Sequence, residues 1–418
     1  MDQLPEIRTE VPGPRSRALA ERLARVECPE VTCLTQPLIF WEHASGSNVT
    51  DVDENRYVDL LAGFGVACLG YAHPELVQVT AAQAATLPHA MSDVYPARLK
   101  LELLEALTRV LPAELGSVIL SSSGSDAVES ALKTALIVTG RPGVVAFEGA
   151  YHGLGLGALD VTQREHFRAP FEARLPNATR FVPYGDADAV RAATRRDPIG
   201  AILVEPIQGR GGIRVPPSGF LRELREIANE SGALLVADEI YTGLGRTGWW
   251  LACEAEGVVP DLITLGKGLG GGFPISACVG RSEIMQKWGP SSGEAIHTST
   301  HLGNPLGCAL ALKVLEVLAR DRLLERARHL GEHVLERLEK EVRPCPGVRD
   351  VRGRGLLLGI ELDEPARAAR IVREALCSGW ILLAEGPDAR VLSLTPPLTI
   401  SEGLLDRAID HLVELLST

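Results

Sequence analysis

A lysine and an aspartate each stand at the end of an apolar segment that is typical of a β-strand. Lys267 follows the segment 263–266 and precedes a glycine-rich turn, and Asp238 follows the segment 233–237. Pyridoxal 5′-phosphate (PLP) chemistry requires an amine that forms a Schiff base with an aldehyde, and a carboxylate that keeps a pyridine nitrogen protonated. Each residue also has an ordinary interpretation, as a surface lysine and as a turn-forming aspartate. The surrounding segments must therefore decide between them.

The elements that would position these two residues alternate between strand and helix. Such alternation predicts a mostly parallel sheet with helices on both faces. Ligands of such sheets bind at the carboxyl ends of the strands, where Gly124, Glu205, Asp238 and Lys267 fall. The expected strands are 117–120, 144–147, 201–204, 233–237, 261–265 and 277–280, and the expected helices in this region are 126–139, 217–231 and 305–320.

A chain of 418 residues exceeds the size at which a single core keeps growing, so we expect two domains. The alternating region indicates a large domain over residues 71–325. Residues 326–418 carry a long amphipathic helix, a strand pair around 379–384 and 390–394, and a last helix over 402–416, which is typical of a smaller α+β domain. The N-terminal segment 1–70 contains short alternating segments, and we expect it to join the small domain.

The bulk composition is that of a soluble globular protein. The formal net charge of −12 argues against a nucleic-acid-binding protein. No apolar run approaches the roughly 18 residues of a membrane span, and the N-terminus does not resemble a secretory signal. The eight cysteines form no Cys-x-x-Cys pair, which favours free thiols in a reducing cytoplasm and no metal site.

Two further segments offer groups that suit a phosphorylated aromatic cofactor. Gly124 and Ser125 lie where a strand leads into a helix, so their backbone N–H groups and the helix N-terminus could bind a phosphate. The alternative is a serine that caps the helix and binds nothing. Tyr151, followed by His152, comes after another strand and could lie against a pyridine ring, although a core position is the simpler interpretation.

Together these segments resemble the class III PLP-dependent aminotransferases, the ornithine and 4-aminobutyrate-like group of fold type I. Six motifs occur in the order typical of the family, and weaker similarity covers nearly the whole chain. The motifs are Ser123-Gly-Ser-Asp-Ala-Val-Glu129, Tyr151-His-Gly153, Val204-Glu-Pro-Ile-Gln-Gly209, Asp238 to Gly248, Leu265-Gly-Lys267 and Thr300-His-Leu-Gly-Asn-Pro305.

The resemblance implies a large domain with a mostly parallel seven-stranded sheet, a smaller α+β domain, and PLP as the cofactor. It implies that Lys267 and Asp238 are catalytic, with Lys267 forming the Schiff base and Asp238 pairing with the ring nitrogen. Thr300 would complete the phosphate site of a neighbouring subunit, which makes the active unit a homodimer or a dimer-based oligomer. The remaining cofactor-binding residues would be Ser123, Gly124, Ser125, Tyr151, His152, Glu205, Ile240 and Tyr241.

Three positions depart from the family pattern and bear on the substrate. Ser393 stands where many members carry a carboxylate-binding arginine, Arg210 stands where amino-acid-handling members often carry a glutamate, and Tyr241 replaces a frequent glutamine, so that its phenol could reach the cofactor or form the pocket wall. Phe64 is a further candidate substrate contact. In one interpretation the amino donor has no α-carboxylate at the usual place, and is an amine, a diamine, an amino sugar or an ω-amino acid. In the other, Arg210 binds the anion from a new direction. We favour the first.

The motifs do not determine the fate of the substrate once its proton is removed. Transamination to a keto acid or aldehyde acceptor is the commonest outcome in the family and our preferred prediction. The alternatives are racemisation or epimerisation, elimination, and a catalytically silent protein of the same fold. A Rossmann dehydrogenase is disfavoured, because the glycines at 268–272 have the wrong spacing and lead into a strand.

Overall fold

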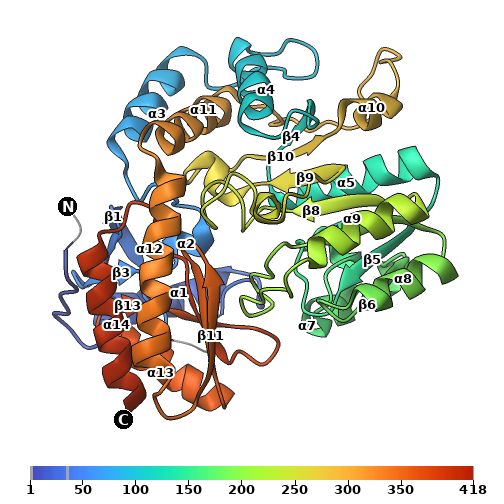
Figure 1. Ribbon diagram of the computed structural model, residues 1–418. Helices are drawn as coiled ribbons and strands as arrows, with labels where there is room; N and C mark the ends of the chain where they lie inside the picture. The colour runs from blue at the N-terminus through green and yellow to red at the C-terminus, as the bar shows by residue number, and fades with distance from the viewer. Residues whose placement is uncertain (1–2, 34–36, 418) are drawn as a thin grey trace.

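The structure is a computed structural model that describes residues 3–33 and 37–417. Figure 1 shows an α/β molecule built around a seven-stranded sheet of order β4-β10-β9-β8-β7-β5-β6. β10 alone pairs antiparallel with its neighbours, and the remaining pairs are parallel. The strands are β4 (Ser117–Ser121), β5 (Gly143–Phe147), β6 (Thr179–Val182), β7 (Ile199–Val204), β8 (Leu234–Asp238), β9 (Leu262–Leu265) and β10 (Ser276–Gly280).

Side chains along the central strands alternate between two hydrophobic clusters, one on each face of this sheet. On β7, Ala201 and Leu203 belong to the cluster that α5 (Gly124–Thr139) covers. Ile202 and Val204 belong to the cluster on the other face, together with residues of α9 (Phe220–Ser231). A strand that is buried on both faces needs a continuous apolar run, which is why these strands could be recognised in the sequence.

At most of the strand ends, the predicted limit lies within one or two residues of the observed limit. β6 was not predicted, because its sequence Thr-Arg-Phe-Val is half polar and it lies at the edge of the sheet. The predicted helix 217–231 begins later, at Phe220, whereas α11 (Pro305–Arg320) has the predicted limits.

Two smaller sheets lie beside the large one. The first has the order β11-β12-β15-β14 and is antiparallel throughout. In the second, β1, β2 and β3 come from the N-terminal segment, and β13 from the C-terminal segment pairs parallel with β3. These strands are β1 (Trp41–Ser45), β2 (Asn48–Asp51), β3 (Arg56–Asp59), β11 (Val348–Arg354), β12 (Leu357–Leu362), β13 (Trp380–Ile381), β14 (Leu383–Glu385) and β15 (Val391–Leu394).

Helices surround the three sheets (Figure 1). Within the described residues, no helix has both the length and the apolar character needed to cross a membrane. The helices not yet given are α1 (Pro14–Val26), α2 (Ala62–Gly65), α3 (Pro74–Thr86), α4 (Arg98–Val110), α6 (Leu156–Asp160), α7 (Glu165–Arg168), α8 (Ala187–Arg196), α10 (Ser282–Met285), α12 (Leu323–Arg337), α13 (Pro365–Cys377) and α14 (Glu402–Ser417).

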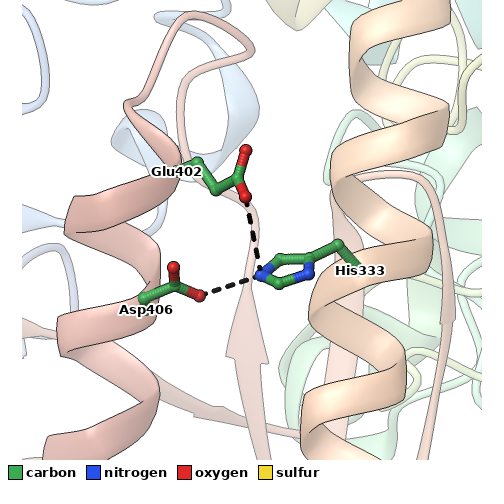
Figure 2. A group of neighbouring side chains, drawn as sticks. All are labelled: His333, Glu402 and Asp406. Atoms are coloured by element: carbon green, nitrogen blue, oxygen red, sulfur yellow. Dashed lines mark hydrogen bonds and ion pairs between the residues drawn. The ribbon is translucent and has the colours of Figure 1, made fainter.

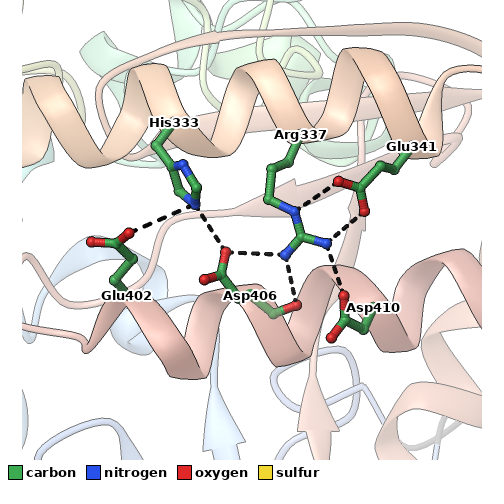
Figure 3. A network of polar contacts seen from close by, with 6 residues as sticks. All are labelled: His333, Arg337, Glu341, Glu402, Asp406 and Asp410. Atoms are coloured by element: carbon green, nitrogen blue, oxygen red, sulfur yellow. Dashed lines mark hydrogen bonds and ion pairs between the residues drawn. The ribbon is translucent and has the colours of Figure 1, made fainter.

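A polar network joins α12 to α14. Nε2 of His333 lies 2.9 Å from Oδ1 of Asp406 and 3.9 Å from Oε1 of Glu402, an arrangement in which one ligand atom of each residue lies within reach of a single metal ion (Figure 2). However, Arg337 on α12 donates to the same Asp406 oxygen at 3.0 Å and also pairs with Asp410 (Figure 3). Because a guanidinium already neutralises this carboxylate, we interpret the group as an ion-pair network that holds the two helices together.

Candidate active site

A cavity of about 320 Å³ opens at the carboxyl ends of β7, β8 and β9. Most of the residues that we expected from the sequence at a cofactor site meet there, although they come from segments far apart in the chain. The lining residues are Gly124, Ser125, Tyr151, His152, Gly153, Leu154, Glu205, Arg210, Asp238, Ile240, Tyr241 and Lys267.

Lys267 begins the short 3₁₀ turn that follows β9. Its φ of 42° lies in the left-handed region, which an L-residue adopts only when its surroundings impose it. Nζ lies 3.9 Å from the ring centroid of Tyr241. Burial lowers the pKa of Lys267 to about 8, although the carboxylates of Asp238 and Glu205 oppose that change. The amine is therefore much more easily deprotonated than that of an ordinary lysine.

Asp238, the last residue of β8, is held by three hydrogen bonds. Its Oδ2 accepts from Nδ1 of His152 at 2.7 Å. Its Oδ1 accepts from Oγ1 of Thr264 at 2.9 Å and from the backbone N–H of Ile240 at 3.1 Å. The carboxylate is buried in the cavity wall with a fixed orientation, so it can stabilise a positive charge placed against it.

Glu205 follows β7 and is fully buried beside this group. It accepts hydrogen bonds from the backbone N–H groups of Tyr151 at 3.2 Å and Gly209 at 3.0 Å. Burial raises the pKa of Glu205 to about 7, with His152 opposing and Asp238 adding to the effect. The carboxylate thus fixes the backbone that carries Tyr151 and also lies within electrostatic range of Lys267.

The N-terminus of α5 forms one end of the cavity. Ser123 is the N-cap residue, whose Oγ accepts from the N–H of Asp126, and it does not belong to the cavity lining. Gly124 and Ser125 do line the cavity. A Cβ on Gly124 would lie 2.9 Å from Cδ1 of Ile240, so a larger residue here would push the Ile240 side chain away. The first turn of a long helix with unhindered N–H groups suits an anion such as phosphate.

Besides Ser123, three candidate residues from the sequence lie away from the cavity lining. Ser393 is buried and its Oγ donates to the carbonyl oxygen of Leu383. Phe64, with a φ of 62°, is half exposed and lines a separate apolar pocket. Thr300 lies in an exposed stretch of the segment before α11. Within this chain, therefore, none of the three contacts the space in front of Lys267.

Tyr241, for which two roles were open, forms part of the pocket wall. Its hydroxyl group hydrogen-bonds with Oγ1 of Thr395 at 3.2 Å, and its ring packs against Lys267. A Cβ on Gly209 or Gly65 would collide with this ring. The phenol is thus committed to the protein, and burial raises its pKa to about 12.

Three polar residues at this site could not be recognised in the sequence. Thr264 binds Asp238 because β8 and β9 are parallel neighbours in which these two residues are partners. Glu385 ends β14, is almost fully buried, and lies with Oε2 3.7 Å from Nε of Arg210. Arg164 lies within electrostatic range of both Arg210 and Glu385. Only the strand pairing and the chain path reveal them, since none belongs to a local motif.

This geometry agrees with comparisons to known proteins. The family model "Aminotransferase class-III" matches residues 33–416, which shows that the chain belongs to the class III aminotransferases. These are pyridoxal-phosphate-dependent enzymes of fold type I, so the fold class, the enzyme class and the cofactor that the sequence predicted are confirmed. The comparisons favour transamination and do not favour the racemase alternative.

Individual relatives are similar over nearly their whole length. The chain is 39% identical to acetylornithine aminotransferase of Methanosarcina mazei, over 90% of this chain and 91% of the relative. It is 41% identical to the acetylornithine aminotransferase of Mycobacterium bovis, over 91% of this chain and 92% of the relative. Among solved structures, ornithine aminotransferase of Toxoplasma gondii superposes with a TM-score of 0.88 at 29% identity, over 96% of this chain and 94% of that one. A transaminase from Virgibacillus superposes with a TM-score of 0.90 at 26% identity, over 96% of this chain and 98% of that one.

The residues around the cavity fit this cofactor. An amine whose pKa is lowered to about 8 and a buried carboxylate both line the cavity. Nε2 of His152 is buried without a hydrogen-bond partner among the described residues, so it can still bond to a ligand. Gly124 and Ser125, the first residues of α5, line the cavity and so place a helix N-terminus where a phosphate could bind.

Proposed function

We propose that this protein transfers the terminal amino group of an ω-amino acid to a keto acid or aldehyde, with Lys267 and Asp238 as its catalytic residues. The observation that carries the proposal is that one cavity is lined by both residues, with the lysine amine partly buried and its pKa lowered to about 8, which favours the neutral form. The names of the relatives, acetylornithine and ornithine aminotransferase, support a donor with an amine remote from its carboxylate.

Lys267 holds the cofactor and moves the proton. When bound, pyridoxal phosphate supplies an electrophilic aldehyde and a ring that withdraws electrons. With its pKa lowered to about 8, Lys267 is partly neutral near pH 7, so Nζ has a free lone pair for covalent bonding. The same nitrogen would act as the base that accepts the proton from the substrate carbon and as the acid that returns it to complete the amino transfer.

Asp238 holds a proton on the cofactor ring nitrogen. The hydrogen bonds from His152, Thr264 and Ile240 keep the carboxylate in one orientation, and its negative charge stabilises the cationic ring nitrogen. His152 positions Asp238, and Glu205 stabilises the backbone of Tyr151. Tyr151 and Ile240, which both line the cavity, would pack against the cofactor ring.

The N-terminus of α5 binds the phosphate. Gly124 and Ser125 supply backbone N–H groups and the Ser125 hydroxyl, whereas Ser123 caps the helix and stabilises it in the required position. The partial positive charge of a helix N-terminus adds to this binding.

A second copy of the chain completes the phosphate site with Thr300. An exposed apolar surface next to Thr300 supports this homodimer, because Tyr95 and Ile296 are 71% and 74% exposed. The two segments that carry them are joined where Oγ1 of Thr298 donates to Asp93 at 3.1 Å. Burial of these two apolar side chains against a second copy of the chain would be favourable.

The dimer predicts that Thr300→Ala lowers the affinity for the cofactor by about tenfold, the effect of losing one hydrogen bond to a charged group. Ser299→Ala, which removes the neighbouring exposed hydroxyl, is the control. Cofactor release by dialysis and subunit mass by sedimentation measure the result. Equal retention in both variants would remove Thr300 from the site.

We also propose that the described residues of the segments 1–70 and 326–418 form one small domain beside a large domain over 71–325; residues 1–2, 34–36 and 418 of these ranges lie outside the described residues. The parallel pairing of β13 with β3 supports this division, because it places C-terminal and N-terminal strands in one sheet. The cytoplasm remains our proposed location, because the buried cysteines of the described chain are thiols, which suit a reducing compartment.

The test of the function is a panel of amine donors applied to the purified holoenzyme. Wild-type protein should convert its cofactor to the aminated form with an ω-amino acid, a change that is visible in the cofactor absorbance. Lys267→Ala should lose both the covalent linkage, assayed by borohydride reduction and peptide mapping, and turnover. Lys287→Ala, which removes an exposed lysine, is the control. Borohydride labelling of any other lysine, or proton exchange in the donor without amination of the cofactor, would contradict the proposal.

A further inference from the structure

Two arginines and one glutamate form a charged group at the edge of the cavity. Arg210 lines the cavity, and its guanidinium carbon lies 4.7 Å from the ring centroid of Tyr151. Arg164 and Arg210 both lie near the ring of Phe167, with guanidinium carbons 5.4 and 5.6 Å from its centroid. Glu385 lies behind Arg210, with Oε2 3.7 Å from Nε.

The backbone of Gly386 holds both arginines in place. Its N–H donates to the carbonyl oxygen of Arg210 at 3.1 Å. Its own carbonyl oxygen accepts from Nη2 of Arg164 at 3.3 Å. The residue after β14 therefore holds the backbone of Arg210 and the guanidinium group of Arg164 next to Glu385. Because backbone groups take part in these contacts, the arrangement of the charged group depends on the fold and not only on flexible side chains at the surface.

Positive charge is in excess in this group. The Glu385 carboxylate is the only acidic side chain that ion-pairs with Arg210 among the described residues, and none pairs with Arg164. At 3.7 Å the Arg210–Glu385 pair is longer than a hydrogen bond, and Nε of Arg210 is buried without a hydrogen-bond partner in the described chain. The Arg210 side chain is 33% exposed whereas that of Glu385 is 6% exposed. The group thus presents guanidinium towards the cavity and keeps its carboxylate inside.

We propose, on the basis of the proposed function, that Arg210 and Arg164 bind the carboxylate of the ω-amino acid, with Glu385 as their buried counter-ion. A guanidinium group matches a carboxylate in shape and charge. The excess of one positive charge is balanced by one carboxylate. Since Arg210 and Lys267 line the same cavity, one substrate can reach Lys267 with its amine and Arg210 with its carboxylate.

The experiment uses the holoenzyme and carboxylates that carry no amine. A series of straight-chain monocarboxylates, with pentanoate as reference, is titrated calorimetrically, and pentanol serves as the uncharged probe. Wild-type protein should bind at least one carboxylate more tightly than the matching alcohol. Arg210→Leu and Arg164→Leu should each weaken carboxylate binding by about tenfold or more, the effect of losing a hydrogen bond to a charged group. Arg214→Leu, which removes an exposed arginine from the same turn outside the cavity lining, should leave binding unchanged.

Glu385→Gln tests the counter-ion separately. It keeps the shape of the side chain but leaves both guanidinium charges free for the ligand, so carboxylate binding should become tighter by several-fold. Weaker binding in this variant would overturn the role of Glu385. Unchanged binding in Arg210→Leu, or an equal loss in Arg214→Leu, would overturn the subsite.

The outcome also separates this inference from the proposed function. A wild-type protein that aminates its cofactor but binds pentanoate no more tightly than Arg210→Leu does contradicts only the carboxylate subsite. Conversely, the wild-type protein could bind pentanoate as expected while none of the tested amine donors converts its cofactor to the aminated form. That result contradicts only the proposed function.

Discussion

Replacing Lys267 with methionine in the cofactor-free protein should change stability in a way that depends on pH. Methionine has a similar length and no charge, so the variant removes the cost of burying a protonated amine. Burial lowers the pKa of Lys267 from 10.5 to about 8. The unfolded chain therefore binds more protons than the folded chain between these two pH values.

The sign results from proton binding. Because the unfolded state carries the extra proton, the contribution of Lys267 to the free energy of unfolding rises with pH from about 8 to 10.5. At about 1.4 kcal/mol for each pKa unit, the rise amounts to roughly 3 kcal/mol. The advantage of Lys267→Met over wild-type protein should thus shrink by roughly 3 kcal/mol across this window. Contributions of buried tyrosines such as Tyr241 occur in both proteins and cancel in the difference.

Urea denaturation of both proteins at intervals between pH 8 and 10.5 measures this difference. Glu205, whose pKa is about 7, stays ionised in the folded protein throughout the window. Lys287→Met gives the effect of removing a lysine from the surface. A stability difference between Lys267→Met and wild-type protein that is constant with pH would refute the reasoning, since it would mean that the folded protein does not lower the pKa of this amine.

Two further predictions concern hydrogen bonds that join distant segments. Thr264→Val removes the 2.9 Å hydrogen bond to Asp238 and leaves a buried charge less well solvated, so the holoenzyme should lose about 1–3 kcal/mol of stability and bind its cofactor more weakly, as thermal denaturation and cofactor titration would measure. Asp406→Asn should cost at most about 1 kcal/mol, because the network with His333 and Arg337 is partly exposed. Burial raises the pKa of Asp406, but hydrogen bonds from His333 and Arg337 outweigh burial and lower that pKa. The contribution of Asp406 to the free energy of unfolding should therefore disappear as the pH falls through the lowered pKa. Urea denaturation of wild-type protein and Asp406→Asn at acidic and neutral pH measures this change. If Asp406→Asn lost the same stability at both pH values, this pH dependence would be contradicted.

Much of the seven-stranded sheet could be predicted because its signals are local. Strands that are buried on both faces appear as apolar runs, and β7 and β8 were predicted within two residues of their limits. β6 was missed because an edge strand needs no such run. The carboxyl ends of parallel strands meet at one edge, so Asp238 and Lys267 could be placed together from their positions in the chain.

The chain by itself determined which chemical groups are present, and the motif order predicted that a lysine, an aspartate and a helix that begins with glycine belong to one site. Only the tertiary structure decided which further groups lie at the cavity that these residues line. Glu385 and Ser393 lie on the paired strands β14 and β15. The register and the packing of that sheet on the turn around Arg210 direct Glu385 to the arginine and leave Ser393 in the interior. Contacts between segments more than a hundred residues apart have no local pattern, because they depend on how separately formed elements pack.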